Sequence, residues 1–495
     1  MAPVSPELFT PGRMLSRLSA EKPAEIALIV EQISGSSQVL TRLELEQWAS
    51  RIAHRYLELA PDIGPGSYVA IHLPNCAEHV VATLAAYKVG ACPMPVSHRM
   101  PAAERDQLLG LANPAVIVSD APELKGISRA AMSESSQYSD VSPPDAVPQP
   151  FKAIASGGST GKPKLIVSPG AFNFPAGAHP LAAIFGLNAG DILYSPGPLY
   201  HNQAFLFTQL ALFMGGCAVL NEKFDAERTL DIIESRKPNV LNMVPTMLSR
   251  MLRSPSIKSR NFKSVRSLWH LAAPCPAWVK HGWIDLIGAE KVMELWAATE
   301  LNGATIINGR EWLERPGSVG RGWNTEIRIF NEQRQLVTAG EVGEIFSRFA
   351  GGPPQFSYLG AKSLETTGDN FTSVGDLGYL DKDGYLFLAD RRVDLIITGG
   401  ANVIPAEVEG ALTQHPSVRD AAVIGLKDDD LGRRVHAIVE WASPTPDATE
   451  KELEAHLRNL LASYKLPRSY EFIPALPRDE AGKIRRGLLR DERGG

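Results

Sequence analysis

The feature that most constrains the fold of this chain is the alternation of short β-like runs with helical patterns in its first 120 residues. Residues 68–73 and 116–119 have the composition of buried strands, and residues 77–88 read as the helix after the first of them. Thr41 and Glu44 form a capping-box pattern that marks the start of another helix. Strands that alternate with helices are typical of parallel β-α-β units. The alternation therefore predicts an α/β fold with parallel-rich sheets.

The pattern changes after about residue 340 and indicates a second, smaller domain. Strand-like runs joined by turns fill residues 344–398. Beyond them we expect a helix over 405–415, strands over 421–425 and 435–441, a further helix, and a last strand over 470–473. The second of these helices is expected to present Leu453, Leu457, Leu460 and Leu461 on one face. A mixed segment of about 100 residues is the size of a small α+β domain.

Composition excludes several classes of protein. Residues AVILMFWYC make up 44% of the chain and charged residues 21%, as in an ordinary globular protein. The chain has 50 Lys and Arg against 55 Asp and Glu, a net charge of −5, so it lacks the excess of basic residues that is typical of nucleic-acid-binding proteins. The longest apolar stretch, residues 206–220, is too short to span a bilayer, and no signal peptide is evident. We expect a soluble, cytoplasmic protein with no nucleic-acid partner and no membrane span.

The cysteine pattern also excludes two kinds of site. The four cysteines lie far apart and without CxxC spacing, which predicts neither a disulfide framework nor a zinc site. They are Cys76, Cys92, Cys217 and Cys275.

The sharpest local motif is a glycine-, serine- and lysine-rich loop over residues 156–164 that directly follows a β-like run. Its sequence is Ser156-Gly-Gly-Ser-Thr-Gly-Lys-Pro-Lys164. Glycines allow close approach of the backbone to a polyphosphate, hydroxyls donate hydrogen bonds, and lysines neutralise charge. The loop departs from the Walker A pattern, because Ser156 stands at the first glycine position and Pro163 follows Lys162. A surface loop is the alternative, but the density of donors favours phosphate binding.

Five further blocks follow this loop in order. They are Ala272-Ala-Pro-Cys-Pro276, Trp296-Ala-Ala-Thr-Glu300, Ser373-Val-Gly-Asp-Leu-Gly378, the segment from Asp390 to Glu409, and Leu476-Pro-Arg-Asp-Glu-Ala-Gly-Lys483. Together the six blocks resemble those of the AMP-forming adenylating superfamily, which contains acyl-CoA synthetases, stand-alone adenylation domains and firefly-type luciferases. The resemblance covers the whole chain. It implies an N-terminal AMP-binding domain over 1–390 with a β-barrel-like part, and a mobile C-terminal lid domain over 391–495.

The resemblance implies ATP-dependent adenylation of a carboxylic acid, with release of pyrophosphate, followed by thioester formation with coenzyme A. ATP, Mg²⁺ and coenzyme A are the implied cofactors. The implied partners are a small-molecule carboxylic acid and either CoA or a carrier protein, and the chain is expected to be a monomer or homodimer. Within the superfamily the sequence most resembles ligases for bile acids, steroids, diterpenoids or fatty acids, so a bulky apolar or polycyclic acid is the expected substrate.

Residue roles follow from the same resemblance. Lys483 would bridge the attacking carboxylate and the α-phosphate, Thr299 would lie near that phosphate, and Glu300 would hold Mg²⁺. His201 would gate the substrate or position its carboxylate, although a packed structural histidine is an equal alternative. The remaining candidates would contact the nucleotide or CoA: Ser156, Gly157, Gly158, Ser159, Thr160, Gly161, Lys164, Ala272, Ala273, Pro274, Trp296, Asp376, Arg391, Gly399 and Gly400.

Several of these assignments have local alternatives. Asp376 would accept the ribose hydroxyls, but turn chemistry beside two glycines accounts for it equally well. Trp296 stands where the family usually has a tyrosine against adenine, and a buried core tryptophan is the competing interpretation. The acyl pocket is expected around His201, Phe205, Trp296, Ala297 and Ala298.

Three positions depart from the family pattern. Gly157 replaces a hydroxyl residue and Ala297 replaces a glycine. Val393 stands at the hinge, where Asp or Lys is common, and its branched side chain is stiff. We therefore expect the adenylation orientation of the small domain to be favoured and CoA transfer to be the slower step. An adenylation-only enzyme that hands its product to a carrier protein, and an inactive homologue that acts as a binding protein, are the alternative functions.

Overall fold

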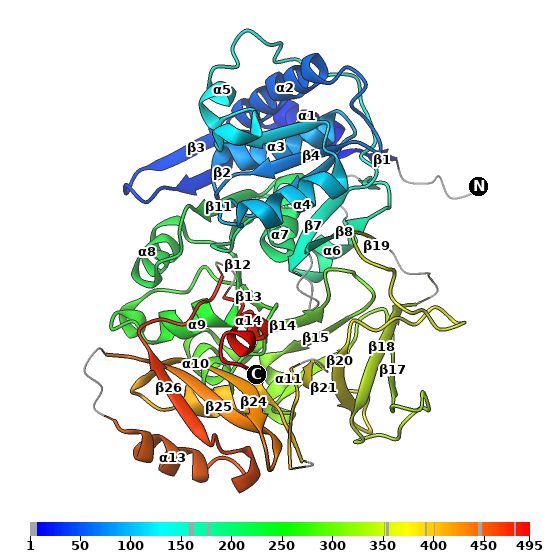
Figure 1. Cartoon of the computed structure of the whole chain (residues 1–495). Helices are drawn as coiled ribbons and strands as arrows, with labels where there is room; N and C mark the ends of the chain where they lie inside the picture. Colours follow the sequence, from blue (N-terminus) through cyan, green and yellow to red (C-terminus); the bar gives the residue numbers. More distant parts are fainter. Residues whose placement is uncertain are drawn as a thin grey trace, which may run out of the picture.

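The structure is a computed structural model, shown in Figure 1. It describes residues 7–157, 163–175, 179–350, 352, 356–391, 394–399, 401–443, 448–479 and 482–495. The predicted site residues Gly158, Ser159, Thr160, Gly161 and Gly400 and the hinge residue Val393 lie outside the described residues, as do the side chains of Ser156, Gly157 and Arg391.

A long mixed sheet forms the centre of the molecule. Its middle consists of parallel neighbours in the order β14-β13-β12-β10-β11-β2, with β3 antiparallel at one edge. These strands are β2 (Ile26–Glu31), β3 (Ser37–Thr41), β10 (Ile192–Tyr194), β11 (Cys217–Asn221), β12 (Val240–Met243), β13 (Ser267–His270) and β14 (Val292–Ala297). The crossover helices are α7 (Asn202–Phe213), α8 (Ala226–Arg236), α9 (Pro245–Leu252) and α10 (Ala277–Ile287). The predicted parallel-rich α/β fold is confirmed.

The other end of this sheet is antiparallel and corresponds to the predicted β-barrel-like part. Beyond β14 the order continues β15-β16-β21-β20-β18-β17. The strands are β15 (Ala304–Asn308), β16 (Ser318–Gly322), β17 (Thr325–Phe330), β18 (Gly343–Phe349), β20 (Asp376–Leu380) and β21 (Leu386–Arg391). Figure 1 shows them in green to yellow on the right.

The first 120 residues form the units that their periodicity predicts. The strands β4 (Tyr68–His72), β5 (Cys92–Pro95) and β6 (Val116–Ser119) make a parallel sheet, and α3 (Ala77–Lys88) follows β4. The capping box of Thr41 and Glu44 opens α2 (Arg42–Leu59). A separate antiparallel sheet contains β7 (Lys152–Gly157), β8 (Pro163–Ser168) and β19 (Ser357–Leu359).

The C-terminal segment has its own sheet and core, which Figure 1 shows in orange and red beside α9 and α10. Its elements are β22 (Ile396–Thr398), β23 (Ala401–Val403), α12 (Pro405–Leu412), β24 (Val418–Asp428), β25 (Gly432–Trp441), α13 (Glu450–Arg458), β26 (Ser469–Ile473) and α14 (Arg486–Asp491). Leu453 and Leu457 are buried as predicted. The predicted helical face is wrong at Leu460, because α13 ends at Arg458 and that side chain is 45% exposed.

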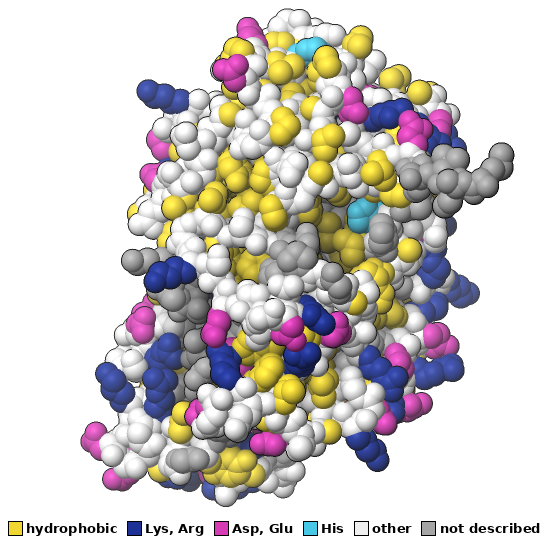
Figure 2. Space-filling view, turned by 90° about the vertical axis from the view of Figure 1, so that its right-hand side faces the viewer, with side chains coloured by type: hydrophobic (Ala, Val, Ile, Leu, Met, Phe, Trp, Pro, Cys, Tyr) yellow, Lys and Arg dark blue, Asp and Glu magenta, His cyan; other side chains and the backbone are white. Residues whose placement is uncertain are grey.

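The molecular surface agrees with the balanced charge of the sequence. Figure 2 shows one face on which dark-blue Lys and Arg are interspersed with magenta Asp and Glu in the lower half, while hydrophobic side chains gather above. Within the described part of the chain, no helix is both long and apolar enough to cross a membrane.

Candidate active site

Three of the site residues predicted in the large domain follow the carboxyl ends of strands in the parallel part of the long sheet. The chain reaches His201 after β10, Ala272 after β13 and Glu300 after β14. These strands run parallel in one sheet with β12 between β10 and β13, so their carboxyl ends share one edge, where α/β folds bind ligands. The sheet order therefore gathers segments that lie far apart in the sequence.

A buried carboxylate marks the centre of this edge. Glu300 is 8% exposed, and its Oε1 accepts a hydrogen bond of 2.7 Å from the Tyr358 hydroxyl. The Lys164 Nζ lies 3.8 Å from the same oxygen and 3.9 Å from the centre of the Tyr358 ring. Leu301 has a left-handed φ of 51°, a strained conformation for a branched side chain that turns the chain sharply after Glu300. A carboxylate held this way beside a lysine suits a phosphate-bound Mg²⁺.

The predicted phosphate loop is flanked by the hairpin of β7 and β8. Ser156 is the register partner of Lys164, and Gly157 that of Pro163, so both ends of the loop are fixed by the ladder. Of the loop, the structure describes the side chains of Pro163 and Lys164, and Lys164 reaches Glu300 as described above. Contacts of the remaining loop residues with phosphate stay a prediction.

Two residues predicted to contact the nucleoside meet directly. The indole Nε1 of Trp296, on β14, donates a hydrogen bond of 3.0 Å to Oδ2 of Asp376, the first residue of β20. Asp376 is also the register partner of Arg391 across β20 and β21. The roles of Trp296 and Asp376 toward a nucleoside stay predictions. The hydrogen bond places an aromatic face and a carboxylate side by side, as recognition of a nucleoside requires.

The segment predicted to flank adenine is strained at its first residue. Ala272 follows β13 with a φ of +75°, in the left-handed region that costs an L-residue roughly 1–2 kcal/mol. Ala272 and Pro274 are exposed and Ala273 is half-buried. Strain of this kind gathers at ligand sites, where the surrounding structure holds the backbone in place.

His201 lies at the junction of the two domains. It is the N-cap residue of α7, and its Nε2 is 3.8 Å from Oδ2 of Asp479 in the small domain. Burial, and then the charge of Lys483, hold the pKa of His201 well below its usual value. The imidazole is thus neutral at neutral pH, and the effect of Lys483 shows that the lysine is near.

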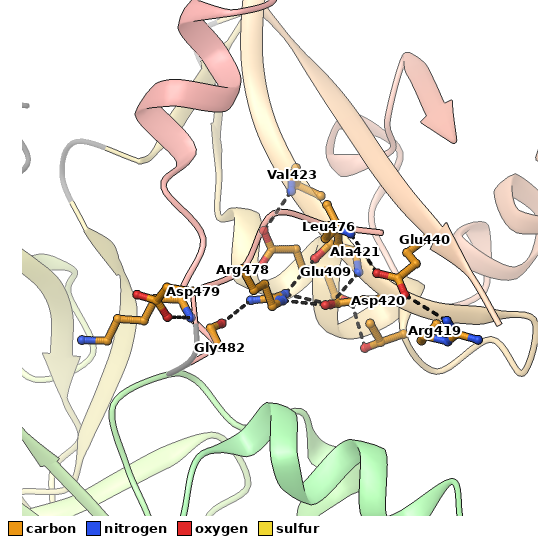
Figure 3. Close-up of polar contacts among 12 residues, drawn as sticks. Glu409, Arg419, Asp420, Ala421, Val423, Glu440, Leu476, Arg478, Asp479 and Gly482 are labelled. Carbon is orange, nitrogen blue, oxygen red and sulfur yellow. Dashed lines mark hydrogen bonds and ion pairs between the residues drawn. The ribbon is translucent and has the colours of Figure 1, made fainter. Parts of the chain in front are cut away.

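The loop that carries Lys483 rests against the large domain. Gly482 has a φ of +73°, and a Cβ placed there would lie 2.1 Å from Oγ1 of Thr246 at the start of α9. The Lys483 amide donates a hydrogen bond of 2.8 Å to Oδ1 of Asp479. Figure 3 shows Asp479 and Gly482 on the side of the small domain that faces the green helix below. In this orientation the predicted catalytic lysine faces the large-domain site.

Gly399 is a site residue that the structure leaves apart from this cluster. Its amide donates to the Leu431 carbonyl at 2.9 Å, within the small domain, and its φ is +54°. No contact of Gly399 with the large-domain cluster is among those described. A different orientation of the small domain would be needed for it to take part.

Sequence reasoning missed several residues of the site. Tyr358, on β19, donates a hydrogen bond to Glu300. Its local sequence does not predict this contact, because the contact depends on the pairing of β19 with β8. Lys152 is fully buried, donates to the Asn202 side chain, and has its pKa lowered to about 7 by burial. Arg478 and Asp479 lie inside the terminal block, so that motif could have shown them.

A cavity of about 210 Å³ lies between the two domains. Arg99, Lys223 and Arg250 of the large domain and Arg478 of the small domain line it, together with the acidic Glu222 and Asp479. Arg478 is paired with Asp420, so the excess positive charge comes from the three large-domain cations against Glu222, which makes that side of the cavity suited to an anionic group.

Comparison with protein families assigns both parts of the chain. The family model described as AMP-binding enzyme matches residues 15–352, and that described as AMP-binding enzyme C-terminal domain matches residues 407–483. The chain belongs to the AMP-binding enzyme family. The suspected resemblance is thereby confirmed, and the protein is an AMP-forming ligase of the acyl-CoA synthetase type. The boundary at residues 390/391 lies between the two matches and stays a prediction.

Individual relatives extend this result over nearly the whole chain. The fatty acid–[acyl-carrier-protein] ligase ScoC of Streptomyces coeruleorubidus is 29% identical over 98% of this chain and 97% of that protein. A feruloyl-CoA synthase of an Amycolatopsis species is 29% identical over 91% of this chain and 93% of its own. The o-succinylbenzoate CoA synthetase of Bacillus subtilis, solved with an acyl-adenylate intermediate, has a TM-score of 0.82 and 26% identity over 99% of both chains.

AMP-binding enzymes of this type use ATP, Mg²⁺ and coenzyme A, and the residues present fit these groups. Across the described residues there is no cluster of three or more His, Cys, Asp or Glu that could hold a metal on its own. Mg²⁺ retains several waters and binds through one or two carboxylates plus substrate phosphates. The single buried Glu300 beside the phosphate-loop lysine therefore suits it.

Proposed function

We propose that this protein adenylates a bulky apolar or polycyclic carboxylic acid at the expense of ATP and then transfers the acyl group to the thiol of coenzyme A. The observation that carries the first step is that the small-domain loop with Lys483 lies against the large domain, with Asp479 3.8 Å from His201 and Gly482 against Thr246. The loop thus faces the strand edge that bears Glu300.

The described residues divide the work of adenylation among them. Lys483 neutralises the charge that develops between the attacking carboxylate and the α-phosphate, where a preorganised cation is most effective. Trp296 and Asp376 would hold the nucleoside, Thr299 would lie near the phosphates, and Glu300 would hold Mg²⁺, which would supply screening of phosphate charge when bound. The neutral His201 offers the acid a hydrogen bond without adding a second positive charge next to Lys483.

The preference for an apolar acid is supported by the packing beside the site. Helix α7 is apolar and buried from Ala204 to Phe213 apart from two polar side chains. Leu295, within β14, and Leu271, directly after β13, are partly buried and pack against a core cluster that contains Phe207. Phe205, which was predicted to line the acyl pocket, is 1% exposed and belongs to a hydrophobic core cluster, so its side chain is not open to an acid. Two relatives act by name on a fatty acid and on a feruloyl group.

The choice of acceptor rests on the cavity between the domains. Coenzyme A carries a pyrophosphate and a 3′-phosphate, whereas a carrier protein presents one phosphodiester. The three cationic side chains that the large domain contributes to the cavity, Arg99, Lys223 and Arg250, stay in place whichever way the small domain is turned, and they favour the more highly charged acceptor. Transfer to a carrier protein is the second candidate, because one full-length relative is by name an acyl-carrier-protein ligase.

The test is pyrophosphate release with ATP and a panel of dodecanoate, ferulate, cholate, acetate and an amino acid. Each acid is assayed alone, with coenzyme A and with a phosphopantetheinylated carrier protein. We expect an apolar acid to give the highest rate and coenzyme A to yield the thioester. If acetate or the amino acid gives the highest rate, the proposal of an apolar acid substrate is wrong. If a thioester forms only on the carrier protein, the proposal of coenzyme A as acceptor is wrong. If no acid gives pyrophosphate release, an inactive homologue is favoured.

A further inference from the structure

Arg253 extends from the large domain into the small one. It is the C-cap residue of α9, and its guanidinium carbon lies 5.0 Å from the centre of the Trp278 ring in the first turn of α10. Stacking on an indole fixes the direction of an arginine and leaves its N–H groups pointing outward. Arg253 donates one hydrogen bond to the Thr413 carbonyl at 2.9 Å and another to the Arg419 carbonyl, both in the small domain.

The two carbonyls are ones that the small domain's own secondary structure leaves without a regular partner. Thr413 is the C-cap residue of α12, and the last carbonyls of a helix have no intrahelical donor. Arg419 lies at the register shift between Val418 and Asp420 in the β24–β25 ladder, where a bulged residue drops out of the pairing. A helix C-terminus also favours a nearby cation. The small domain thus presents a site shaped for a guanidinium.

This site is joined to the Lys483 loop by further hydrogen bonds. Asp420, next to Arg419, accepts from Arg478 at 2.5 Å and 2.7 Å. Arg478 in turn donates to the Gly482 carbonyl at 2.7 Å. Figure 3 shows the contacts from Asp420 through Arg478 to Gly482, and Arg419 is the chain neighbour of Asp420. Both arginine and carboxylate are about 15% exposed, so water competes little for the pair.

We propose that Arg253 is a positioning residue, which holds the small domain in the orientation that brings Lys483 to the large-domain site. It therefore serves the adenylation half-reaction and not the transfer to thiol. The kinetic part of this inference rests on the proposed function, whereas the orientation part does not.

A second cross-domain contact provides a reporter for the orientation. Arg485 of the small domain lies 3.2 Å from Glu104 of α4 (Ala102–Ala112) in the large domain. Its side chain is 53% exposed, so this ion pair contributes little to the stability of the orientation. Replacing both residues by cysteine would place two thiols on opposite sides of the domain junction.

The orientation test measures cross-linking of Glu104→Cys/Arg485→Cys by a short bismaleimide in the absence of substrate. Three native cysteines are buried and Cys275 is partly exposed, so the single-cysteine variants give the background. Adding Arg253→Ala should slow cross-linking by roughly fivefold to tenfold, the scale of lost charge-assisted hydrogen bonds. Adding Arg260→Ala, which removes ion pairs with Glu227, Asp231 and Glu234 of the large domain, should leave the rate unchanged. An unchanged rate with Arg253→Ala overturns the proposal.

The kinetic test separates the half-reactions with dodecanoate and with pre-made dodecanoyl-adenylate. Arg253→Ala should lower single-turnover pyrophosphate release by about tenfold and leave capture of the adenylate by coenzyme A within twofold. Arg253→Lys should restore part of the first rate, because an ammonium reaches only one carbonyl at a time. Arg253→Gln serves if the alanine variant fails to fold. An equal loss of rate in both half-reactions would mean that Arg253 has a merely structural role and would overturn the proposal. Inactivity of the parent protein with every acid would instead contradict the proposed function, and the cross-linking result would still test the orientation.

Discussion

The two domains hold their parts of the candidate site in different ways. In the large domain Glu300, Lys164 and Tyr358 contact one another directly, with Lys164 and Tyr358 on the paired strands β8 and β19 and Glu300 in the turn after β14. In the small domain Lys483 lies on a loop that Arg478 ties to β24, and this loop reaches the large domain only when the whole domain is suitably placed. The large-domain cluster depends on packing, whereas the position of Lys483 depends on a few polar contacts across a junction. Substitutions on the two sides should therefore have different kinetic signatures.

Lys483→Ala tests the difference most strongly. Loss of a preorganised cation at the reacting phosphate should reduce adenylation by roughly 10²–10³ while a pre-made acyl-adenylate still reacts with thiol. The measurement is single-turnover pyrophosphate release against thioester formation. Lys465→Ala, which breaks a pair with Glu407 in the same domain, is the matched control. Pyrophosphate release at the parent rate would remove Lys483 from the mechanism.

Gly482→Ala tests the close approach of the loop to the large domain. The added Cβ would meet Oγ1 of Thr246 at 2.1 Å and strain a residue with positive φ. Adenylation should fall by about tenfold or more, and thiol capture should be retained because it does not need this contact. Gly487→Ala is the control, since nothing lies within 4 Å of its added methyl group. Combining Gly482→Ala with Thr246→Ala should recover part of the rate, and no recovery would argue against the clash.

Trp296→Phe tests the large-domain side. Phenylalanine keeps an aromatic face but loses the N–H group that binds Asp376 at 3.0 Å. A lost hydrogen bond to a charged group is worth about 1.5–3 kcal/mol when buried and less here, so the KM for ATP should rise severalfold with little change in kcat. Trp323→Phe, in the half-buried hairpin between β16 and β17, should change neither. A selective loss of kcat would contradict a role in nucleoside binding.

Ala272→Gly should have the smallest effect of these substitutions, and it should raise the stability of the protein slightly. Glycine relieves the strain at φ +75° but gains freedom in the unfolded chain, so the net stabilisation should be at most about 1 kcal/mol. Thermal unfolding measures it. Lys237, at the end of α8, also has a positive φ, of +51°, so Lys237→Gly should stabilise the protein by a similar amount. Only Ala272→Gly should also change the KM for ATP. A lowered Tm for Ala272→Gly would show that the strain is not stored there.

The sequence predicted the α/β body and the small domain, because periodicity and ordered motifs are local properties, and the same motifs supplied the candidate site residues, whose roles stay predictions. It could not predict which side chains meet. The Trp296–Asp376 hydrogen bond joins strands that are far apart in the sequence. Tyr358 reaches Glu300 because of a strand pairing that no sequence pattern predicts. The end of α13 was misplaced because leucines at 460 and 461 continue the apolar spacing after the helix has ended. The hinge interpretation of Val393 and the roles of Gly158 to Gly161 stay predictions.

The indole N–H of Trp296 that binds the Asp376 carboxylate also has an optical consequence. Indole emission responds to hydrogen bonding at its nitrogen and to the polarity around its ring, and a purine placed against the ring would quench it. The chain contains eight tryptophans, so the contribution of Trp296 is the difference between the spectra of the parent and of Trp296→Phe. That difference would let nucleotide arrival be followed in real time without a label, before any bond to the acid is made.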